Sequence, residues 1–299
     1  MPLDGYAVAR WLAYGATLTL VGLAAAPAIL ARSGHSPALE PSIRHRGARL
    51  GLVAASLLVL ATCLRLWYQA RSFLEPGEAV TREIVGLVLA SGMWGTGWKL
   101  VAGIALLLLA VWATPSLRRF GGLHRLLVLG LVAATPFAGH AAAGESAAWR
   151  GIALHAFHLL ATGAWLGTLL VLAVAAFPPL LRQGAEAREA DMARLVRTFS
   201  PLALVGAGAA AASGLVLAWT LVGSTGAVAA SEYGRWLVLK LALVAVVAGI
   251  GFRNWRVLTP RLGEAAAEPM ARSAGTELAF GALILLATAV LVALEAPGL

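Results

Sequence analysis

Long apolar runs, broken by short polar segments, cover almost the whole chain. Within a run such as IALLLLAVWA at 104–113, apolar residues follow one another without the alternation of a membrane β-barrel. Lipid offers the backbone no hydrogen-bond partners, so each run of about 20 residues predicts a transmembrane helix. Eight helices are expected, at 8–31, 50–70, 98–113, 123–143, 152–181, 202–221, 233–255 and 276–294. The pattern therefore predicts an all-α, polytopic membrane protein in which residues 1–299 form a single transmembrane helical domain.

One further apolar segment is too short to cross the bilayer. The stretch IVGLVLASGMW at 84–94 is about half the length of a span, and the sequence Gly-Thr-Gly follows it. We expect an interfacial or re-entrant helix there, which would carry Met93 on the outer side of the membrane.

The composition agrees with a membrane location. The chain is 60% hydrophobic and 12% charged, about half the charged fraction of a typical soluble domain. Its polar segments, shorter than about 20 residues, cannot fold alone. No basic segment precedes the first apolar run, so no cleavable signal peptide is expected. The single cysteine, Cys63, excludes a disulfide within the chain.

The charge distribution predicts the orientation. A net charge of +9 would suggest nucleic acid as the partner of a soluble protein, but here the arginines gather in short segments between spans, so the expected partner is the lipid bilayer and no nucleic acid. The segments after the first, third, fifth and seventh spans hold 15 of the 23 basic residues. Cytoplasmic loops carry such an excess, so both termini are predicted to be periplasmic.

A weak helix-pair repeat is also expected. Residues 66–119 and 218–262 each contain a tryptophan that ends one span, a small-residue turn, a tryptophan that opens the next span, and Thr-Pro followed by arginine. Duplicated helix pairs are common in transporters, where binding sites often form between the two halves.

Ionisable side chains inside spans are costly, and many of them are functional. The candidates are Arg65, Lys99, His140, His155, His158, Lys240 and Glu277. Arg65 and Lys99 lie near the surface and are expected to snorkel. Lys240 either snorkels or positions or repels a cation. Glu277 either complements a helix N-terminus or a loop arginine, or serves as a cation exit or a proton-linked carboxylate.

The histidines are the strongest candidates. His155 and His158 are three residues apart and share a helix face, which Thr162 and Trp165 continue. His140 lies near the outer end of the preceding span, and the short connection makes the two spans neighbours. Three imidazoles at one level would suit copper or zinc, with Met93 and Trp165 beside the path of the ion. The alternative is that each histidine hydrogen-bonds a neighbouring helix or faces a water pocket.

The motifs around these histidines resemble those of the copper resistance D (CopD) family of inner-membrane proteins. The matching stretches are GHAAAGE at 139–145, LHAFHLLATGAWLGTLLVL at 154–172, and then 195–219, 233–244, 253–262 and 275–287. The resemblance implies a CopD-like core at about residues 120–299 and copper uptake across the bacterial inner membrane, often with a separate periplasmic CopC-type copper-binding partner. By position it implies roles for His140, His155, His158, Lys240 and Glu277.

Three functions remain open at this stage. The first is copper transport, as Cu(I) or Cu(II), through a His-lined intramembrane site; the chain has no Walker-type loop for ATP. The second is a b-type membrane redox protein, in which His140 and either His155 or His158 would hold haem. The third is a scaffold that delivers copper to an oxidase during assembly. No paired carboxylates or Ser/His/Asp arrangement indicates an enzyme.

Overall fold

The computed structural model describes residues 4–138, 148–222 and 231–294, and every regular element in these ranges is a helix. The α-helices are α1 (Gly5–Ser33), α2 (Glu40–Arg71), α3 (Arg82–Ala90), α4 (Gly92–Ala113), α5 (Pro115–Arg118), α6 (Gly121–Ala134), α7 (Ala148–Thr162), α8 (Thr168–Val171), α9 (Phe177–Leu181), α10 (Ala185–Val222), α12 (Glu232–Arg253) and α13 (Ala267–Leu291). The 3₁₀ turns are η1 (Pro37–Leu39), η2 (Thr135–Ala138) and η7 (Thr259–Arg261). The π-helical turns are η4 (Gly163–Gly167), η5 (Leu172–Ala176) and η6 (Asn254–Leu258).

Eight of the described helical stretches are long and apolar enough to cross a membrane, as predicted. They are Gly5–Ser33, Pro37–Arg71, Gly92–Ala113, Gly121–Ala138, Trp149–Leu181, Ala185–Thr220, Glu232–Arg261 and Ala267–Leu291. The fifth span is the continuous run of α7, η4, α8, η5 and α9.

Several spans extend well beyond their apolar runs. The sequence predicts starts at residues 50, 202 and 276, whereas α2, α10 and α13 begin at Glu40, Ala185 and Ala267. An apolar run marks only the part of a helix that lies in lipid, and the helical backbone can continue into the polar region beyond. Many arginines that we expected in loops therefore lie in helical extensions, for example Arg46 in α2 and Arg194 in α10.

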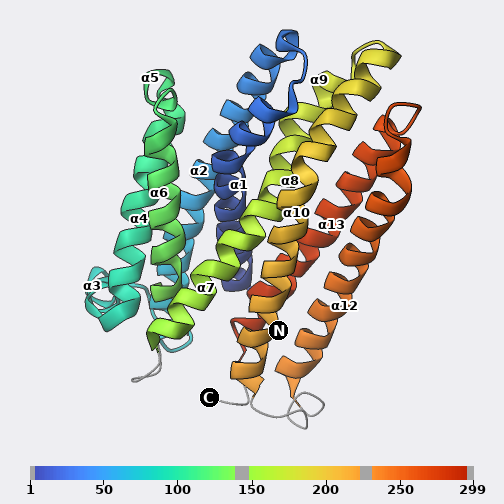
Figure 1. Ribbon diagram of the computed structural model, residues 1–299. Coiled ribbons are helices and arrows are strands. Elements are labelled where there is room, and N and C mark those ends of the chain that lie inside the picture. Colours follow the sequence, from blue (N-terminus) through green and yellow to red (C-terminus); the bar gives the residue numbers. More distant parts are fainter. Residues whose placement is uncertain (1–3, 139–147, 223–230, 295–299) are drawn as a thin grey trace.

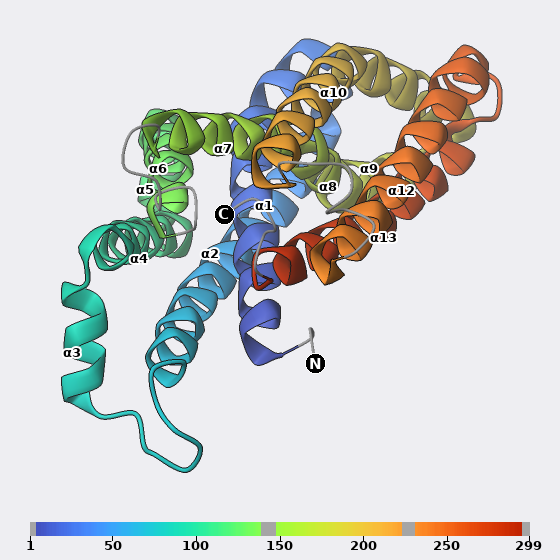
Figure 2. The ribbon, with the colours of Figure 1, turned by 90° about the horizontal axis from the view of Figure 1, so that it is seen from below.

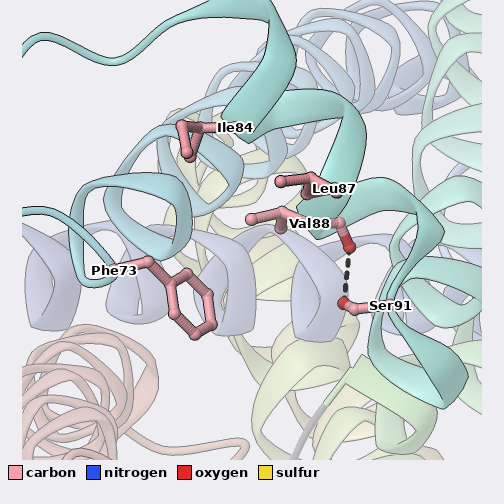
Figure 3. A pocket seen from close by; sticks show the side chains of 5 residues that line it. All are labelled: Phe73, Ile84, Leu87, Val88 and Ser91. Atoms are coloured by element: carbon pink, nitrogen blue, oxygen red, sulfur yellow. Dashed lines mark hydrogen bonds between the residues drawn. The ribbon is translucent and has the colours of Figure 1, made fainter.

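The short helix α3 lies across the axis of the bundle beside the outer ends of α2 and α4 (Figures 1 and 2). Figure 3 shows an apolar hollow of about 260 Å³ there, lined by Phe73 from just after α2 and by Ile84, Leu87, Val88 and Ser91. Leu87 is 62% exposed, which suits a helix that rests at the membrane interface. The segment is thus a short helix outside the long spans, and its place at the membrane interface stays a prediction.

The third span starts earlier than expected, because α4 begins at Gly92 and runs through the glycines that suggested a break. These glycines are needed for close packing. A Cβ atom on Gly95 would overlap with the backbone of α3, and one on Gly97 would lie 2.7 Å from the Ala138 nitrogen of η2.

Helix α1 is the centre of the bundle, surrounded by α2, α6, the fifth span, α10 and α13 (Figure 2). In the most apolar part of α1, 61% of the residues are buried inside the protein, and the fifth span has the same buried fraction. In the span that contains α12, only 11% are buried. Helix α12 packs mainly on α13, at the edge of the bundle (Figure 1).

The crossing of α1 and the fifth span brings two backbones into contact. A Cβ atom on Gly22 would overlap with the Gly167 carbonyl group, and one on Gly167 would overlap with the Leu18 carbonyl oxygen. Gly163, four residues before Gly167, packs against Val21 in the same way. Small residues spaced by four are a common means of close helix packing in membranes.

Helix α1 begins and α13 ends at the same end of the bundle, the lower end in Figure 1, and we call it the outer end after the orientation predicted from the charges. The segments rich in arginine lie at the opposite, inner end. The even number of crossings places the two ends of the described chain on one side of the membrane.

Candidate functional site

The fifth span carries the candidate metal ligands in its outer part. His155 and His158 lie on α7, with His155 about 10 Å along the helix from its start. Both are half-buried. The Thr162 hydroxyl donates to the His158 carbonyl oxygen at 2.7 Å, and the helix then widens into the π-turn η4, which contains Trp165. Such π-turns inside α-helices occur often at functional sites.

Helix α10 holds the His158 ring in one orientation. His158 Nδ1 lies 3.0 Å from Ser213 Oγ. The Ser213 hydroxyl is 4% exposed and donates within its own helix to the Ala209 carbonyl oxygen at 2.6 Å. The next residue is Gly214, and a Cβ atom there would lie 3.1 Å from His158 Cε1, so the glycine leaves room for the ring.

This arrangement determines which imidazole nitrogen is available. The 2.6 Å distance from Ser213 Oγ to the Ala209 carbonyl oxygen assigns the serine proton to that bond, and from this we infer that the Ser213 oxygen accepts from His158 Nδ1–H. A neutral imidazole has one protonated nitrogen, so the lone pair of His158 is on Nε2. A hydrogen bond at one nitrogen that fixes the other as the ligand is the usual support of a metal-binding histidine.

The structure brings Lys240 to the same region. This half-buried side chain of α12 interacts electrostatically with both His155 and His158. A positive charge in electrostatic range of two imidazoles would oppose a cation bound there by Coulomb repulsion. The region therefore combines two candidate imidazole ligands with a positive charge that would limit how strongly they hold a cation.

The third predicted ligand, His140, lies outside the described residues. Among the residues that are described, no group of three His, Cys, Asp or Glu side chains is arranged to hold a metal ion. The described part of the site is thus the pair His155 and His158, and the ligand triad stays a prediction.

The other predicted pathway residues fall in different places. Trp165 is half-buried between the two main apolar clusters of the bundle, next to Gly206 of α10. Met93 is in the first turn of α4 and is 41% exposed. Helix α4 packs mainly against α2, α3, α5, α6 and η2, and α7, which carries the histidine pair, is not among its main neighbours.

Glu277 lies at the inner end of the bundle in a buried polar network. It accepts a hydrogen bond from Asn254 Nδ2, and Asn254 Oδ1 accepts one from Ser273 Oγ at 2.6 Å. All three side chains are at most 9% exposed. Asn254 is the first residue of the π-turn η6, so this network includes a π-turn of the seventh span. Within the described residues Glu277 makes no ion pair with an arginine, and its hydrogen-bond partner is Asn254; its role in a cation or proton pathway stays a prediction.

Two arginines of the bundle are buried in a way that the sequence did not predict: Arg65 was expected to snorkel, and Arg10 was not singled out. Arg65 does not snorkel: it is 9% exposed, and its Nη2 donates to the Ala138 carbonyl oxygen at 3.0 Å. Arg10 of α1 is equally buried and lies over the Tyr6 ring. The signal that could have found Arg10 is its position midway between Tyr6 and Tyr14, four residues from each, on one helix face.

Glu189 was also overlooked. Its carboxylate is 5% exposed and accepts hydrogen bonds from the Ala266 and Ala267 amides at 3.0 and 3.1 Å, at the start of α13. A carboxylate at a helix N-terminus satisfies free N–H groups and the helix dipole together. The sequence did not indicate Glu189 because it lies in the polar extension of α10, outside any apolar run.

Comparison with known families gives two matches that together cover most of the chain. Residues 1–150 match the family described as "Copper resistance protein D-like, N-terminal domain", and residues 193–291 match "Copper resistance protein D". No curated protein and no solved structure matches the chain. The two matches follow one another in the order of the chain and share one description, and the eight helices suit a membrane protein. The chain therefore belongs to the copper resistance protein D family, which gives it a copper-related function in the membrane.

Proposed function

We propose that the protein carries copper across the bacterial inner membrane, and that His155 and His158 bind the ion in the outer part of the bundle. The observation that carries this proposal is the 3.0 Å hydrogen bond between His158 Nδ1 and Ser213 Oγ, from which we infer that Nε2 is free as a ligand. Imidazole nitrogen is a suitable ligand for both oxidation states of copper. His140 is the proposed third ligand.

The direction of entry follows from the charges. The inner end of the bundle carries most of the arginines, and cytoplasmic ends of membrane proteins carry such an excess. The histidine pair is then nearer the periplasm, and copper arrives from that side. A separate periplasmic copper-binding protein of the CopC type is the proposed donor.

Two charged groups support transport of the copper ion rather than its storage. The ammonium group of Lys240 repels a cation at the histidines, so the ion binds weakly enough to leave, as conduction requires. Glu277, buried at the inner end, is the proposed carboxylate on the way out. Buried acids in spans commonly mark ion pathways.

The test is copper uptake by the full chain in proteoliposomes. We expect His155→Ala and His158→Ala to abolish uptake and to weaken Cu(I) binding in detergent. His45→Ala is the matched control, because His45 is exposed at the inner end and should leave both unchanged. Uptake by both variants at the wild-type rate would refute the site.

A visible absorption spectrum of the same preparation, before and after reduction with dithionite, separates transport from the haem alternative. We expect no Soret band. A Soret band that disappears in the His155→Ala and His158→Ala variants would replace the copper site by a haem site.

A further inference from the structure

A second polar cluster lies at the outer ends of α1 and α2, on the side of α1 that faces α2. The Tyr6 hydroxyl donates to Gln69 Oε1 at 2.8 Å, and the Tyr6 and Tyr68 rings stack with centroids 5.9 Å apart. These contacts fix how the two antiparallel helices are aligned, because Tyr6 of α1 lies opposite Gln69 of α2.

The same alignment places two arginines opposite one another. Arg10 follows Tyr6 by four residues, and Arg65 precedes Gln69 by four, so each lies one turn further into the bundle on the same face. Tyr14, one turn further along α1, interacts electrostatically with both guanidinium groups. Two positive charges therefore meet at one level of a helix interface.

Both arginines are buried and short of hydrogen-bond acceptors. Each is 9% exposed. Among the described residues Arg10 has no hydrogen-bond partner; its Cζ lies 3.7 Å from the centroid of the Tyr6 ring, and its Nη1 is buried without an acceptor. Arg65 donates from Nη2 to the Ala138 carbonyl oxygen, and its Nε is buried without an acceptor.

No acidic side chain compensates these charges in the part of the chain that the structure describes. The ion pairs found there join Arg188 to Glu268 and Arg194 to Asp191, both at the inner end. Burying a cation with neither a counter-charge nor its hydrogen bonds is strongly unfavourable, and one aromatic face offsets only a small part of that cost. Two such cations at one level repel each other as well.

We propose that Arg10 and Arg65 together bind a phosphate group between the outer ends of α1 and α2. The planar guanidinium fork pairs with phosphate oxygens through two parallel hydrogen bonds, and two forks can share one phosphate. Arg10 lies about 7.5 Å along α1 from its start, a depth near the boundary between lipid headgroups and hydrocarbon. The phosphate belongs either to a phospholipid or to inorganic phosphate. Arg10 lies on α1 and the histidine pair on α7, so the Arg10 variants test this site separately from the histidines, whereas Arg65 bonds the Ala138 carbonyl group, two residues before the proposed ligand His140.

The experiment uses the full chain, purified in detergent, stripped of lipid and kept in phosphate-free buffer. We would measure the phosphorus retained by the chain and the shift in its thermal unfolding temperature on adding sodium phosphate or phosphatidylglycerol vesicles. The variants are Arg10→Gln and Arg65→Gln. Arg235→Gln is the matched control, because Arg235 is an exposed arginine near the outer end of α12.

We expect both probes or one of them to stabilise the wild type and the control. A shift with phosphatidylglycerol alone identifies a lipid headgroup, and a shift with sodium phosphate identifies a soluble anion. Each loss of a charged hydrogen-bonding group should weaken binding by about tenfold or more in the two arginine variants. Arg10→Lys keeps the charge without the fork, so it should also bind more weakly while folding like the wild type.

Either of two results would overturn the proposal. One is a wild type that retains no phosphorus and shows no shift with either probe. The other is an equal shift in Arg10→Gln, Arg65→Gln and the Arg235→Gln control. Copper binding is measured with the same preparations, so that failure of the phosphate site can be distinguished from failure of the transport proposal. The phosphate site can fail while the histidines still bind copper.

Discussion

Replacing Ser213 by alanine tests whether the hydrogen bond to His158 prepares the imidazole for a metal. The substitution removes the acceptor that lies 3.0 Å from His158 Nδ1, in a region where the serine is 4% exposed. A buried donor left without a partner costs about 1–3 kcal/mol, unless the proton moves to Nε2, the nitrogen that should bind the ion. Loss of such a supporting partner typically weakens metal affinity by about 10–100-fold.

The assay is a competition titration of Cu(I) against a chelator, with the full chain in detergent. Ser213→Thr keeps the hydroxyl group and should restore most of the affinity. Ser200→Ala is the matched control. Like Ser213, Ser200 donates its hydroxyl proton to a carbonyl oxygen of α10, that of Val196 at 2.7 Å, but it lies away from the histidines. Nitrogen-15 shifts of His158 should show a protonated Nδ1 in the wild type and in Ser213→Thr.

Two outcomes would refute this reasoning. An affinity of Ser213→Ala indistinguishable from that of Ser200→Ala would show that the bond has no effect on the metal. A wild-type spectrum with the proton on Nε2 would show that the serine donates to the ring and that the assignment of the lone pair is wrong.

Three further substitutions test how the spans are held together, each by thermal or denaturant unfolding in detergent. Glu189→Ala removes the acceptor of two buried amides at the start of α13 and should cost about 3 kcal/mol; a loss no larger than that of an exposed glutamate would contradict the capping role. Gly167→Ala forces its new methyl group against the Leu18 carbonyl oxygen and should cost about 1–3 kcal/mol, whereas Gly103→Ala, with open space around it, should be neutral or stabilising. Equal stability of the two alanine variants would disprove the close crossing. Trp11→Phe deletes the hydrogen bond from Nε1 to a carbonyl oxygen of α13 at 2.9 Å and should cost about 1 kcal/mol, and an unchanged unfolding midpoint would show that this bond contributes nothing.

The number and type of the spans could be predicted because lipid restricts the chain to apolar helices. Their true ends could not. Helices α10 and α13 continue past their apolar runs because contacts between them, such as the Glu189 cap, stabilise backbone outside the lipid. The start of α4 was misplaced since Gly95 and Gly97 look like breakers in isolation, and only their contacts with α3 and η2 explain them.

For the site, the sequence indicated the histidines but not what supports them. His155 and His158 are conspicuous because imidazole is rare in an apolar helix. Ser213 is not, since serine in a membrane helix commonly bonds its own backbone, and only the packing of α7 on α10 shows that its oxygen also accepts from His158. Arg10 and Arg65 were hidden for a similar reason: near the end of a span an arginine normally reaches water, and whether it does depends on the neighbouring helices.

The backbone contact between Gly22 and Gly167 also bears on motion. Two helices that touch main chain to main chain have no layer of side chains between them that could slide or rotate, so α1 and the fifth span form a rigid frame. His155 and His158 stand on that frame. Alternating access in membrane carriers commonly moves one helix group against another around a stationary binding site. In this bundle we infer that the mobile element is α12, which packs mainly on α13 at the edge of the bundle and carries Lys240, so that its movement would withdraw the ammonium charge from the histidines.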